Sequence, residues 1–262
     1  MHLELINKVA LVTASSRGLG YACAAALAAE GARVAMCSRS MERIQAAAAE
    51  IAKKTRGSTV GIEADLTRDD HLIAVVRQTE AMYGPIDILV LNTGNPPSGR
   101  FSEVSDEDWA RGLSLCLRAP IILSRQILPG MRARKFGRII FLSSIFAKEP
   151  DERYVVSSTL RAGLGALAKC LAREVGGDGV CVNVICAGYF QTPLLEEQAD
   201  QQSAIRGRTA KELLSEWAQL APVNHLGNPC DLGKLVAFLA SPATGFLQGT
   251  SIALDGGALH VS

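Results

Sequence analysis

Several features that would assign a protein to a specialised class are missing from this sequence. The seven cysteines form no Cys-x-x-Cys pair, and the four histidines show no metal-ligand spacing. The charges nearly cancel, because 27 basic residues are set against 26 acidic ones, and no long run carries one sign. These absences remove the usual arguments for a disulfide framework, a metal site, nucleic acid or an anionic membrane surface. We therefore expect a small molecule as the partner, with no metal, no nucleic acid and no membrane.

Signals for export are missing as well. The opening residues, MHLELINK, lack the basic-then-apolar order of a signal peptide. No apolar run approaches the roughly 18 residues that a membrane span needs. Several cysteines fall inside apolar patterns, where a reduced cysteine behaves as a small hydrophobe. We expect a soluble protein of the cytoplasm.

What the sequence does have is a regular alternation of short apolar runs and helical patterns. With 262 residues, of which 48% are hydrophobic, the chain can bury a large core. Parallel strands need crossover connections and must be covered on both faces. The alternation therefore predicts the α/β class, a doubly wound, Rossmann-type parallel sheet of about seven strands with helices on both faces. The predicted strands are residues 8–13, 33–37, 58–64, 86–91, 137–143, 180–186 and 251–254, and the main predicted helices are residues 21–30, 41–54, 106–134, 157–175 and 231–240.

Two local signals refine the helices. Thr67 and Asp70 resemble a capping box at the start of a further helix, which ends at Tyr83. Pro120 should kink or divide the long helix of residues 106–134, since proline lacks the backbone N–H that a helix interior uses.

One segment does not follow the alternation of strand and helix patterns. Residues 187–228 are long and polar, and they contain one amphipathic piece at 211–220. We expect one domain over residues 1–262, in which residues 189–228 form a mobile insertion over the site.

The stretch from Val9 to Gly20, VALVTASSRGLG, joins an apolar strand to a helix through a turn that contains glycine. Glycine permits positive φ and a close approach of the backbone to a pyrophosphate, and a helix N-terminus presents free N–H groups. Glycine can also serve a purely steric purpose in such a turn, so the turn alone leaves both interpretations open. Its place after the first strand of a βαβ unit favours a nucleotide site.

Further motifs accompany this turn in order along the chain. They are Asp65, Leu91-Asn92-Thr93-Gly94, Leu142-Ser143-Ser144, Ala187-Gly188 through Thr192-Pro193, and Asp255-Gly256-Gly257. With the turn from Thr13 to Gly20, the set resembles the short-chain dehydrogenase/reductase family, and in particular its 3-oxoacyl-carrier-protein reductases, over residues 8–257. The family's counterparts are the TGxxxGxG turn, an adenine-contacting aspartate, NNAG, a substrate-contacting serine, a PG…TP segment over the nicotinamide, and DGG. Motifs in register are far more specific than one glycine turn.

The resemblance implies a bound nicotinamide dinucleotide. Three of the residues that would contact this cofactor could have a purely structural role instead. Asp65 could be a turn or cap residue, Asn92 could tie neighbouring strands together, and Thr192 could start a loop. The cofactor-binding residues that the resemblance implies are Ser15, Arg17, Gly18, Leu19, Gly20, Ser38, Arg39, Asp65, Leu66, Asn92, Thr93, Gly94, Arg161, Gly188 and Thr192.

The end of the second strand informs the choice of cofactor. An acidic side chain there would accept hydrogen bonds from the adenosine ribose and repel a 2′-phosphate. This sequence has Ser38 followed by Arg39 instead, and Arg17 in the glycine turn could supply a second positive charge. Both arginines could also be simply solvated. We predict NADP in preference to NAD.

The sequence departs from the family where catalysis takes place. Alignment of the helix ends puts Ser157 and Arg161 at the positions of the family's Tyr-x-x-x-Lys pair. The two residues share one helical face. A serine hydroxyl is much less acidic than a phenol, and an arginine stays protonated and cannot shuttle protons.

Two further departures accompany this one. Cys116 stands where the family commonly has an asparagine that supports a water in its proton relay. Ala14 replaces the first glycine of the turn, where an alanine at positive φ would be strained. The turn must therefore accept negative φ at Ala14 or differ slightly from the family's turn.

Tyr154 offers a replacement for the missing phenol. If the helix extends back that far, Tyr154, Ser157 and Arg161 share one face, and Arg161 could stabilise the ionised phenol of a proton donor. The alternative is an ordinary loop tyrosine beside residues 150–153.

The favoured function is an NADP(H)-dependent oxidoreductase that transfers hydride to or from a carbonyl or secondary alcohol. Its candidate catalytic residues are Ser144, Tyr154, Ser157 and Arg161, with Ser144 bonded to the substrate oxygen. The alternative is a non-catalytic dinucleotide-binding protein that kept the fold and lost the catalytic pair, and a third possibility is a reaction that needs no tyrosine acid. The resemblance also implies a homotetramer or homodimer, with interfaces formed by residues 106–134 with the helix from Ser157, and by residues 238–261.

Overall fold

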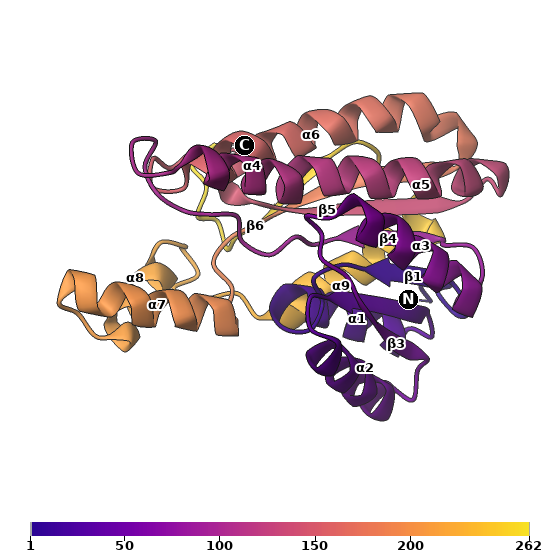
Figure 1. Cartoon of the computed structure of the whole chain (residues 1–262), viewed down its shortest axis with the longest axis horizontal. Coiled ribbons are helices and arrows are strands. Elements are labelled where there is room, and N and C mark those ends of the chain that lie inside the picture. Colours follow the sequence, from indigo (N-terminus) through magenta and orange to yellow (C-terminus); the bar gives the residue numbers. More distant parts are fainter. Residues whose placement is uncertain (1, 262) are drawn as a thin grey trace.

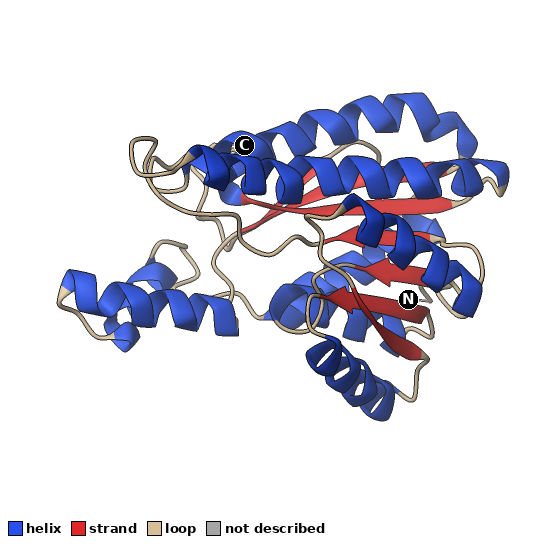
Figure 2. Ribbon diagram, viewed as in Figure 1, coloured by secondary structure: helices blue, strands red, loops and turns tan. Residues whose placement is uncertain are grey.

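The computed structural model describes residues 2–261, without the side chains of residues 204 and 205. Its centre is one sheet of seven strands in the order β3-β2-β1-β4-β5-β6-β7, and every neighbouring pair is parallel. The prediction of a doubly wound parallel sheet is confirmed (Figures 1 and 2). The strands are β1 (Val9–Val12), β2 (Arg33–Ser38), β3 (Thr59–Glu63), β4 (Ile88–Leu91), β5 (Gly137–Ser144), β6 (Val180–Ala187) and β7 (Ser251–Leu254).

Helices cover both faces of the sheet. Alternate residues of a strand point to opposite faces, so Val9 and Leu11 of β1 pack on one face while Ala10 and Val12 pack on the other. The first face is covered by α3, α5 and α6, and the second by α1, α2 and α9 (Figure 2). Burial on both faces explains why the strands are almost entirely apolar. The helices are α1 (Gly18–Ala29), α2 (Met41–Thr55), α3 (Asp69–Tyr83), α4 (Asp106–Leu113), α5 (Ala119–Ala133), α6 (Val155–Val175), α7 (Pro193–Arg206), α8 (Ala210–Gln219) and α9 (Pro229–Ala240).

The strand order reverses between β1 and β4. After β1 the chain builds outward through β2 and β3, and β4 then returns to the other side of β1. Such a switch point opens a crevice beyond the carboxyl ends of the two strands, where open α/β sheets bind their ligands. The glycine turn follows β1, and Asn92 to Gly94 follow β4, so the predicted motifs meet at this crevice.

The long helix predicted for residues 106–134 is divided. A π-helical turn, Ser114–Arg118, separates α4 from α5, and Pro120 lies in the first turn of α5. Proline supplies no N–H to the preceding turn, so the backbone widens there. The predicted effect of Pro120 is confirmed, and the wide turn contains Cys116.

The predicted capping box at Thr67 is wrong. The helix begins at Asp69 after Arg68, which makes no side-chain cap. Asp70 pairs with Arg68 at 2.8 Å instead, and the Thr67 hydroxyl donates to Asp65 at 2.8 Å. Thr67 is thus engaged by the carboxylate two residues before it rather than by the helix.

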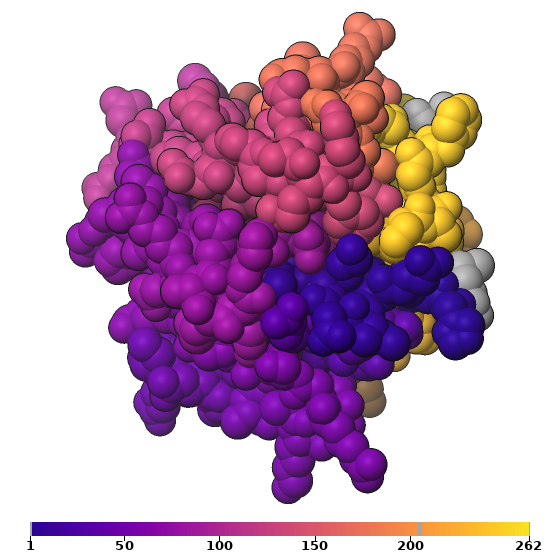
Figure 3. Space-filling model, turned by 90° about the vertical axis from the view of Figure 1, so that its right-hand side faces the viewer, coloured from indigo at the N-terminus to yellow at the C-terminus, as the bar shows by residue number. Residues whose placement is uncertain are grey.

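The segment after β6 has more structure than its polarity indicates. It folds into two helices, α7 and α8, which share a small core of Leu195, Ala199, Leu213 and Trp217. The amphipathic piece predicted at 211–220 corresponds to α8. The pair projects from the body beside the carboxyl edge of the sheet (Figure 1). On the side of the molecule away from α7 and α8, residues near the N-terminus (indigo in Figure 3) lie beside residues late in the chain (yellow), and Leu3 packs in the same cluster as Leu247, which precedes β7.

Among residues 2–261, one helical stretch, Val155–Asp178, is long and apolar enough by length and composition to cross a membrane. Its α6 portion packs against β5 and β6, and Val156, Leu160 and Leu164 are part of the core. These contacts are those of a core helix.

Candidate active site

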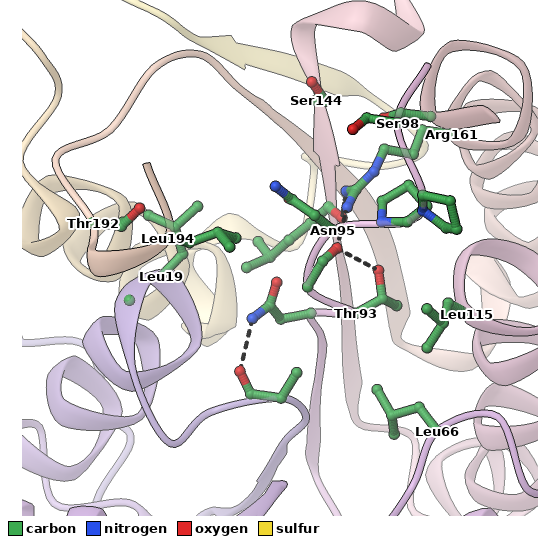
Figure 4. Close-up of a pocket in the computed structure, with 18 of the residues that line it drawn as sticks. Leu19, Leu66, Thr93, Asn95, Ser98, Leu115, Ser144, Arg161, Thr192 and Leu194 are labelled. Carbon is green, nitrogen blue, oxygen red and sulfur yellow. Dashed lines mark hydrogen bonds between the residues drawn. The ribbon is translucent and has the colours of Figure 1, made fainter. Parts of the chain in front are cut away.

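A cleft of about 860 Å³ runs along the carboxyl edge of the sheet, from the end of β2 to the end of β6. This size suits a small-molecule or cofactor site. All four candidate catalytic residues, Ser144, Tyr154, Ser157 and Arg161, line it. Figure 4 shows Ser144 and Arg161 in the cleft. The predicted cofactor-binding residues that line it are Arg17, Gly18, Leu19, Ser38, Arg39, Asp65, Leu66, Asn92, Thr93, Gly94, Arg161, Gly188 and Thr192.

Ser15 and Gly20 are not among the residues that line the cleft, and their contact with a cofactor stays a prediction. The Ser15 hydroxyl is fully buried, donates to the carbonyl of Val12 at 2.8 Å and accepts from the N–H of Cys37 at 3.2 Å. A Cβ at Gly20 would lie 2.5 Å from the carbonyl oxygen of Ala14. Both residues therefore hold the turn against the strands that support it.

The glycine turn contains a strained alanine. Ala14 has φ of 45°, so the turn keeps the positive φ of a glycine position although the residue is alanine. Left-handed backbone costs a residue with a Cβ roughly 1–2 kcal/mol. Gly18 also has positive φ, at 61°, and a Cβ there would lie 3.6 Å from Cγ2 of Thr192, so this part of the turn approaches the start of α7 closely.

Asn92 joins the two strands at the switch point. Its side-chain N–H donates to the carbonyl of Ala14 at 2.9 Å, and its own backbone carbonyl accepts from the Thr13 hydroxyl at 2.6 Å. The simpler role, tying neighbouring strands together, is therefore realised. Asn92 also lines the cleft, and the nearby Gly94 has φ of 71° with no atom within 4 Å of a Cβ position, so the backbone there faces open space.

Two arginines mark the β2 end of the cleft. Arg39 lines it as predicted, and Arg43 of α2 joins it. Within the described part of the chain, neither has a carboxylate within ion-pair distance. Sequence reasoning missed Arg43, although its spacing of four from Arg39 at the start of a helix was a usable signal.

Asp65 faces this end as well. Burial opposes its ionisation, but hydrogen bonds from the N–H and hydroxyl of Thr67, at 2.9 and 2.8 Å, together with the charge of Arg39, hold the pKa of Asp65 below its usual range. The carboxylate therefore stays charged and in a fixed position. Asp65 thus stabilises its own turn and also lines the cleft.

Arg17 is already paired. Its guanidinium makes a two-pronged contact with the carboxylate of Glu197, in which Nη2 and Oε2 are 2.9 Å apart. The two side chains are 45% and 48% exposed. Their hydrogen bond raises the pKa of Arg17 and lowers that of Glu197. Arg17 is therefore not simply solvated, because the pair connects the N-terminus of α1 to α7. That Arg17 binds a phosphate of the cofactor stays a prediction.

At the other end of the cleft, Arg161 binds the backbone. Its side chain is buried, and its guanidinium donates to the carbonyl of Leu142 at 2.9 Å and to that of Gly94 at 2.7 Å. Its Nε atom is buried with no partner among the described residues. These hydrogen bonds hold the ends of β4 and β5 together. The role of Arg161 in orienting a ribose stays a prediction.

Cys116 lies fully buried near Arg161 and Thr93. Burial raises the pKa of its thiol, although the charge of Arg161 and a hydrogen bond with Thr93 act in the opposite direction. The thiol therefore stays protonated at neutral pH, and it is a weaker hydrogen-bonding group than the asparagine amide that the family commonly has there.

Tyr154 does not lie on the helical face that was proposed for it. The helix begins at Val155, and Tyr154 precedes it with φ of −127°. Its ring nevertheless lines the cleft and stacks on Phe146, with ring centroids 4.5 Å apart. The residue before it, Arg153, is held by Asp151 through a hydrogen bond of 2.6 Å.

The fold and the cleft define a class. A parallel sheet with a glycine turn at its switch point, and a cleft that runs from that turn to a serine and a tyrosine, is the arrangement of a dinucleotide-binding oxidoreductase. Comparison with known proteins makes this specific. Residues 13–259 match the family described as enoyl-(acyl carrier protein) reductase.

Known relatives match nearly the whole chain. The oxidoreductase UcpA of Escherichia coli K12 is 32% identical, over 97% of this chain and 95% of that protein. The 3-oxoacyl-[acyl-carrier-protein] reductase FabG of Haemophilus influenzae is 32% identical, over 96% and 98%. The structure of L-sorbose reductase from Gluconobacter frateurii, solved with NADPH and L-sorbose, covers 100% of both chains with a TM-score of 0.95 and 32% identity. The chain belongs to the short-chain dehydrogenase/reductase family, and the expected resemblance is confirmed.

Proposed function

We propose that this protein is an NADP(H)-dependent oxidoreductase that reduces a carbonyl compound or oxidises a secondary alcohol. The observation that carries the proposal is the single cleft, which joins Arg39 and Arg43 at one end to Ser144 and Tyr154 at the other. Residues 1–262 act as one dinucleotide-binding domain, and residues 189–228, with α7 and α8, form its substrate loop.

The residues present fit a phosphorylated dinucleotide. Arg39 and Arg43 offer two guanidinium groups that form no ion pair with the carboxylates of the described residues. They lie beside Ser38, where an acidic residue would repel a 2′-phosphate. Gly18 and the N-terminus of α1 suit the diphosphate, and the open backbone at Gly94 leaves room for the rest of the molecule. When bound, NADP(H) supplies or accepts the hydride.

The chain's own residues would then handle the substrate oxygen and its proton. The Ser144 hydroxyl accepts from the N–H of Phe146 at 3.3 Å, which leaves its proton free to donate to a substrate oxygen. Tyr154 is the proton donor in this proposal. The other phenol in the cleft, Tyr189, is less suitable, because burial and then the neighbouring Tyr154 and Asp151 raise its pKa to about 12.

Ser157 and Arg161 complete the site. Ser157 lines the cleft with a hydroxyl that can bond a ribose or a water. The buried charge of Arg161 contributes positive potential where an alkoxide or phenolate develops, while its hydrogen bonds fix the strand ends that carry Gly94 and Leu142.

The relatives support this assignment. Those compared include a 3-oxoacyl-[acyl-carrier-protein] reductase, an acetoacetyl-CoA reductase and a sorbose reductase bound to NADPH. The second candidate function is a non-catalytic dinucleotide-binding protein. The joint presence of Cys116, Ser157 and Arg161 in place of the family's usual residues favours it.

One experiment separates the two functions. NADPH and NADH binding is titrated by fluorescence, and NADPH oxidation is then followed against a panel of ketones, aldehydes and quinones. The oxidoreductase should bind NADPH more tightly than NADH, lose that preference in an Arg39→Ala/Arg43→Ala variant, and oxidise NADPH with at least one carbonyl. Tight binding without turnover on any substrate would favour the non-catalytic protein.

We also propose that the protein acts in the cytoplasm and that it forms a homodimer or homotetramer. An apolar groove of about 530 Å³ on the outer faces of α5 and α6 supports the assembly, since Leu128, Leu167 and Leu171 line it. Light scattering after size-exclusion chromatography tests the assembly, and Leu167→Glu should shift it towards monomer.

A further inference from the structure

Four aromatic side chains touch in series beside the cleft, although aromatic residues make up only 5% of the chain. The rings of Phe146 and Tyr154 stack with centroids 4.5 Å apart and planes at 12°. Tyr189 meets Phe146 edge-on, at 6.3 Å and 83°. Tyr189 in turn stacks on Trp217 at 6.0 Å and 18°. We call these four side chains the aromatic wall.

The wall is assembled by the fold from separate parts of the chain. Phe146 follows β5, Tyr154 precedes α6, Tyr189 follows β6 and Trp217 belongs to α8. Strands β5 and β6 lie on the opposite side of the switch point from β2, which carries the turn to Arg39. The wall therefore lies at the same end of the cleft as Ser144, away from the arginines that suit the cofactor's phosphate.

Part of the wall is free to make contacts. Phe146, Tyr154 and Tyr189 line the cleft and are partly exposed, while Trp217 is buried behind Tyr189. The carboxylates that line the cleft, Asp65 and Glu107, belong to other elements. The carboxylate whose charge acts on Tyr189, Asp151, is paired with Arg153, so the wall presents ring surface beside a neutralised ion pair.

We propose that the aromatic wall binds the ring of a planar, conjugated carbonyl substrate, of the class of aryl ketones. This inference rests on the proposed reductase function and adds the class of substrate. Two stacked pairs set nearly at right angles form a corner, in which a flat ring can stack on one pair and meet the other edge-on. A saturated ring is thicker and lacks the ring quadrupole, so it gains neither contact.

The test compares two ketones with the same carbon skeleton, 2-acetylnaphthalene and 2-acetyldecalin. Their binding is measured by ligand-observed NMR, with and without NADPH, and is therefore independent of turnover. The naphthyl ketone should bind about tenfold more tightly, the upper range for aromatic pairing. Phe146→Leu should bring the two affinities close together, whereas Phe246→Leu, at an exposed residue between α9 and β7, should leave the preference intact.

Circular dichroism checks that the variants are folded. If Phe146→Leu does not fold, Tyr189→Leu replaces it, because it removes the ring that follows β6 from the aromatic wall. Equal binding of the two ketones, tighter binding of the decalin, or binding of neither overturns the inference, even if other carbonyls are reduced. A naphthyl preference without NADPH oxidation by any carbonyl supports the aromatic wall and counts against the reductase function.

Discussion

Arg17 at the start of α1 and Glu197 in α7 form a bidentate ion pair beside the cleft. The contact joins residues that are 180 positions apart in the chain. It fastens the substrate loop to the turn that would receive the cofactor's diphosphate. A phosphate that recruits Arg17 must therefore compete with Glu197.

Glu197→Gln should strengthen NADPH binding. The substitution frees Arg17, and an exposed ion pair of this kind supports a gain of about two- to fivefold in affinity. Fluorescence titration at low salt measures the gain, which should shrink as salt screens the charges. Glu196→Gln is the matched control, because it removes the same charge one residue away. An equal effect of the two substitutions would show that Arg17 and Glu197 do not compete with the cofactor.

Ala14→Gly should stabilise the protein. Ala14 adopts positive φ, which glycine accepts without strain, so the free energy of unfolding should rise by about 1 kcal/mol after the entropy cost of glycine. Urea denaturation measures the change. Ala25→Gly, inside α1, should lower the free energy of unfolding by a similar amount. Destabilisation by Ala14→Gly would mean that the Ala14 methyl group contributes packing that outweighs the strain.

Tyr154→Phe should reduce turnover by at least about a hundredfold, because it removes the proposed proton donor and keeps the ring. NADPH affinity should stay within about twofold, since Tyr154 lies at the far end of the cleft from Arg39. Tyr189→Phe is the control: its phenol has a pKa of about 12, and its loss should leave turnover largely unchanged. Full activity of Tyr154→Phe would remove Tyr154 from the mechanism.

Arg161→Lys should destabilise the protein by about 2 kcal/mol. The two guanidinium nitrogens of Arg161 donate to the carbonyls of Leu142 and Gly94. A lysine has a single nitrogen and cannot reproduce this planar geometry, so at least one of the two carbonyls loses its charged donor. Urea denaturation measures the loss, and Arg125→Lys on the exposed face of α5 should have little effect. An unchanged free energy of unfolding would show that these two hydrogen bonds are replaceable.

The sheet and the cofactor end of the cleft could be predicted from the sequence because their signals are local. The strands are short, mostly apolar runs, of which β1, β4 and β6 are buried throughout, and Gly18, Asn92 and Arg39 lie within recognisable motifs at strand ends. Pro120 likewise divides a helix through its own missing N–H.

The remaining features depend on contacts between distant segments. Glu197 could not be paired with Arg17 from spacing, and the aromatic wall brings together four separate parts of the chain. Helices α7 and α8 were underestimated because each buries few apolar residues, chiefly against the other. Whether α6 includes Tyr154 could not be decided from the sequence, because a helix boundary depends on the backbone around it, here the pairing of Gly99 with Tyr154.

The most direct test of the proposed function follows the hydride itself. The protein is incubated with NADPH deuterated at the transferable C4 position and with a panel of ketones, aldehydes and quinones, and the products are analysed by mass spectrometry. We expect deuterium on the new carbinol carbon of at least one product, at a rate that Tyr154→Phe greatly reduces. NADPH that binds tightly while no product gains deuterium would contradict the proposal and identify a dinucleotide-binding protein without reductase activity.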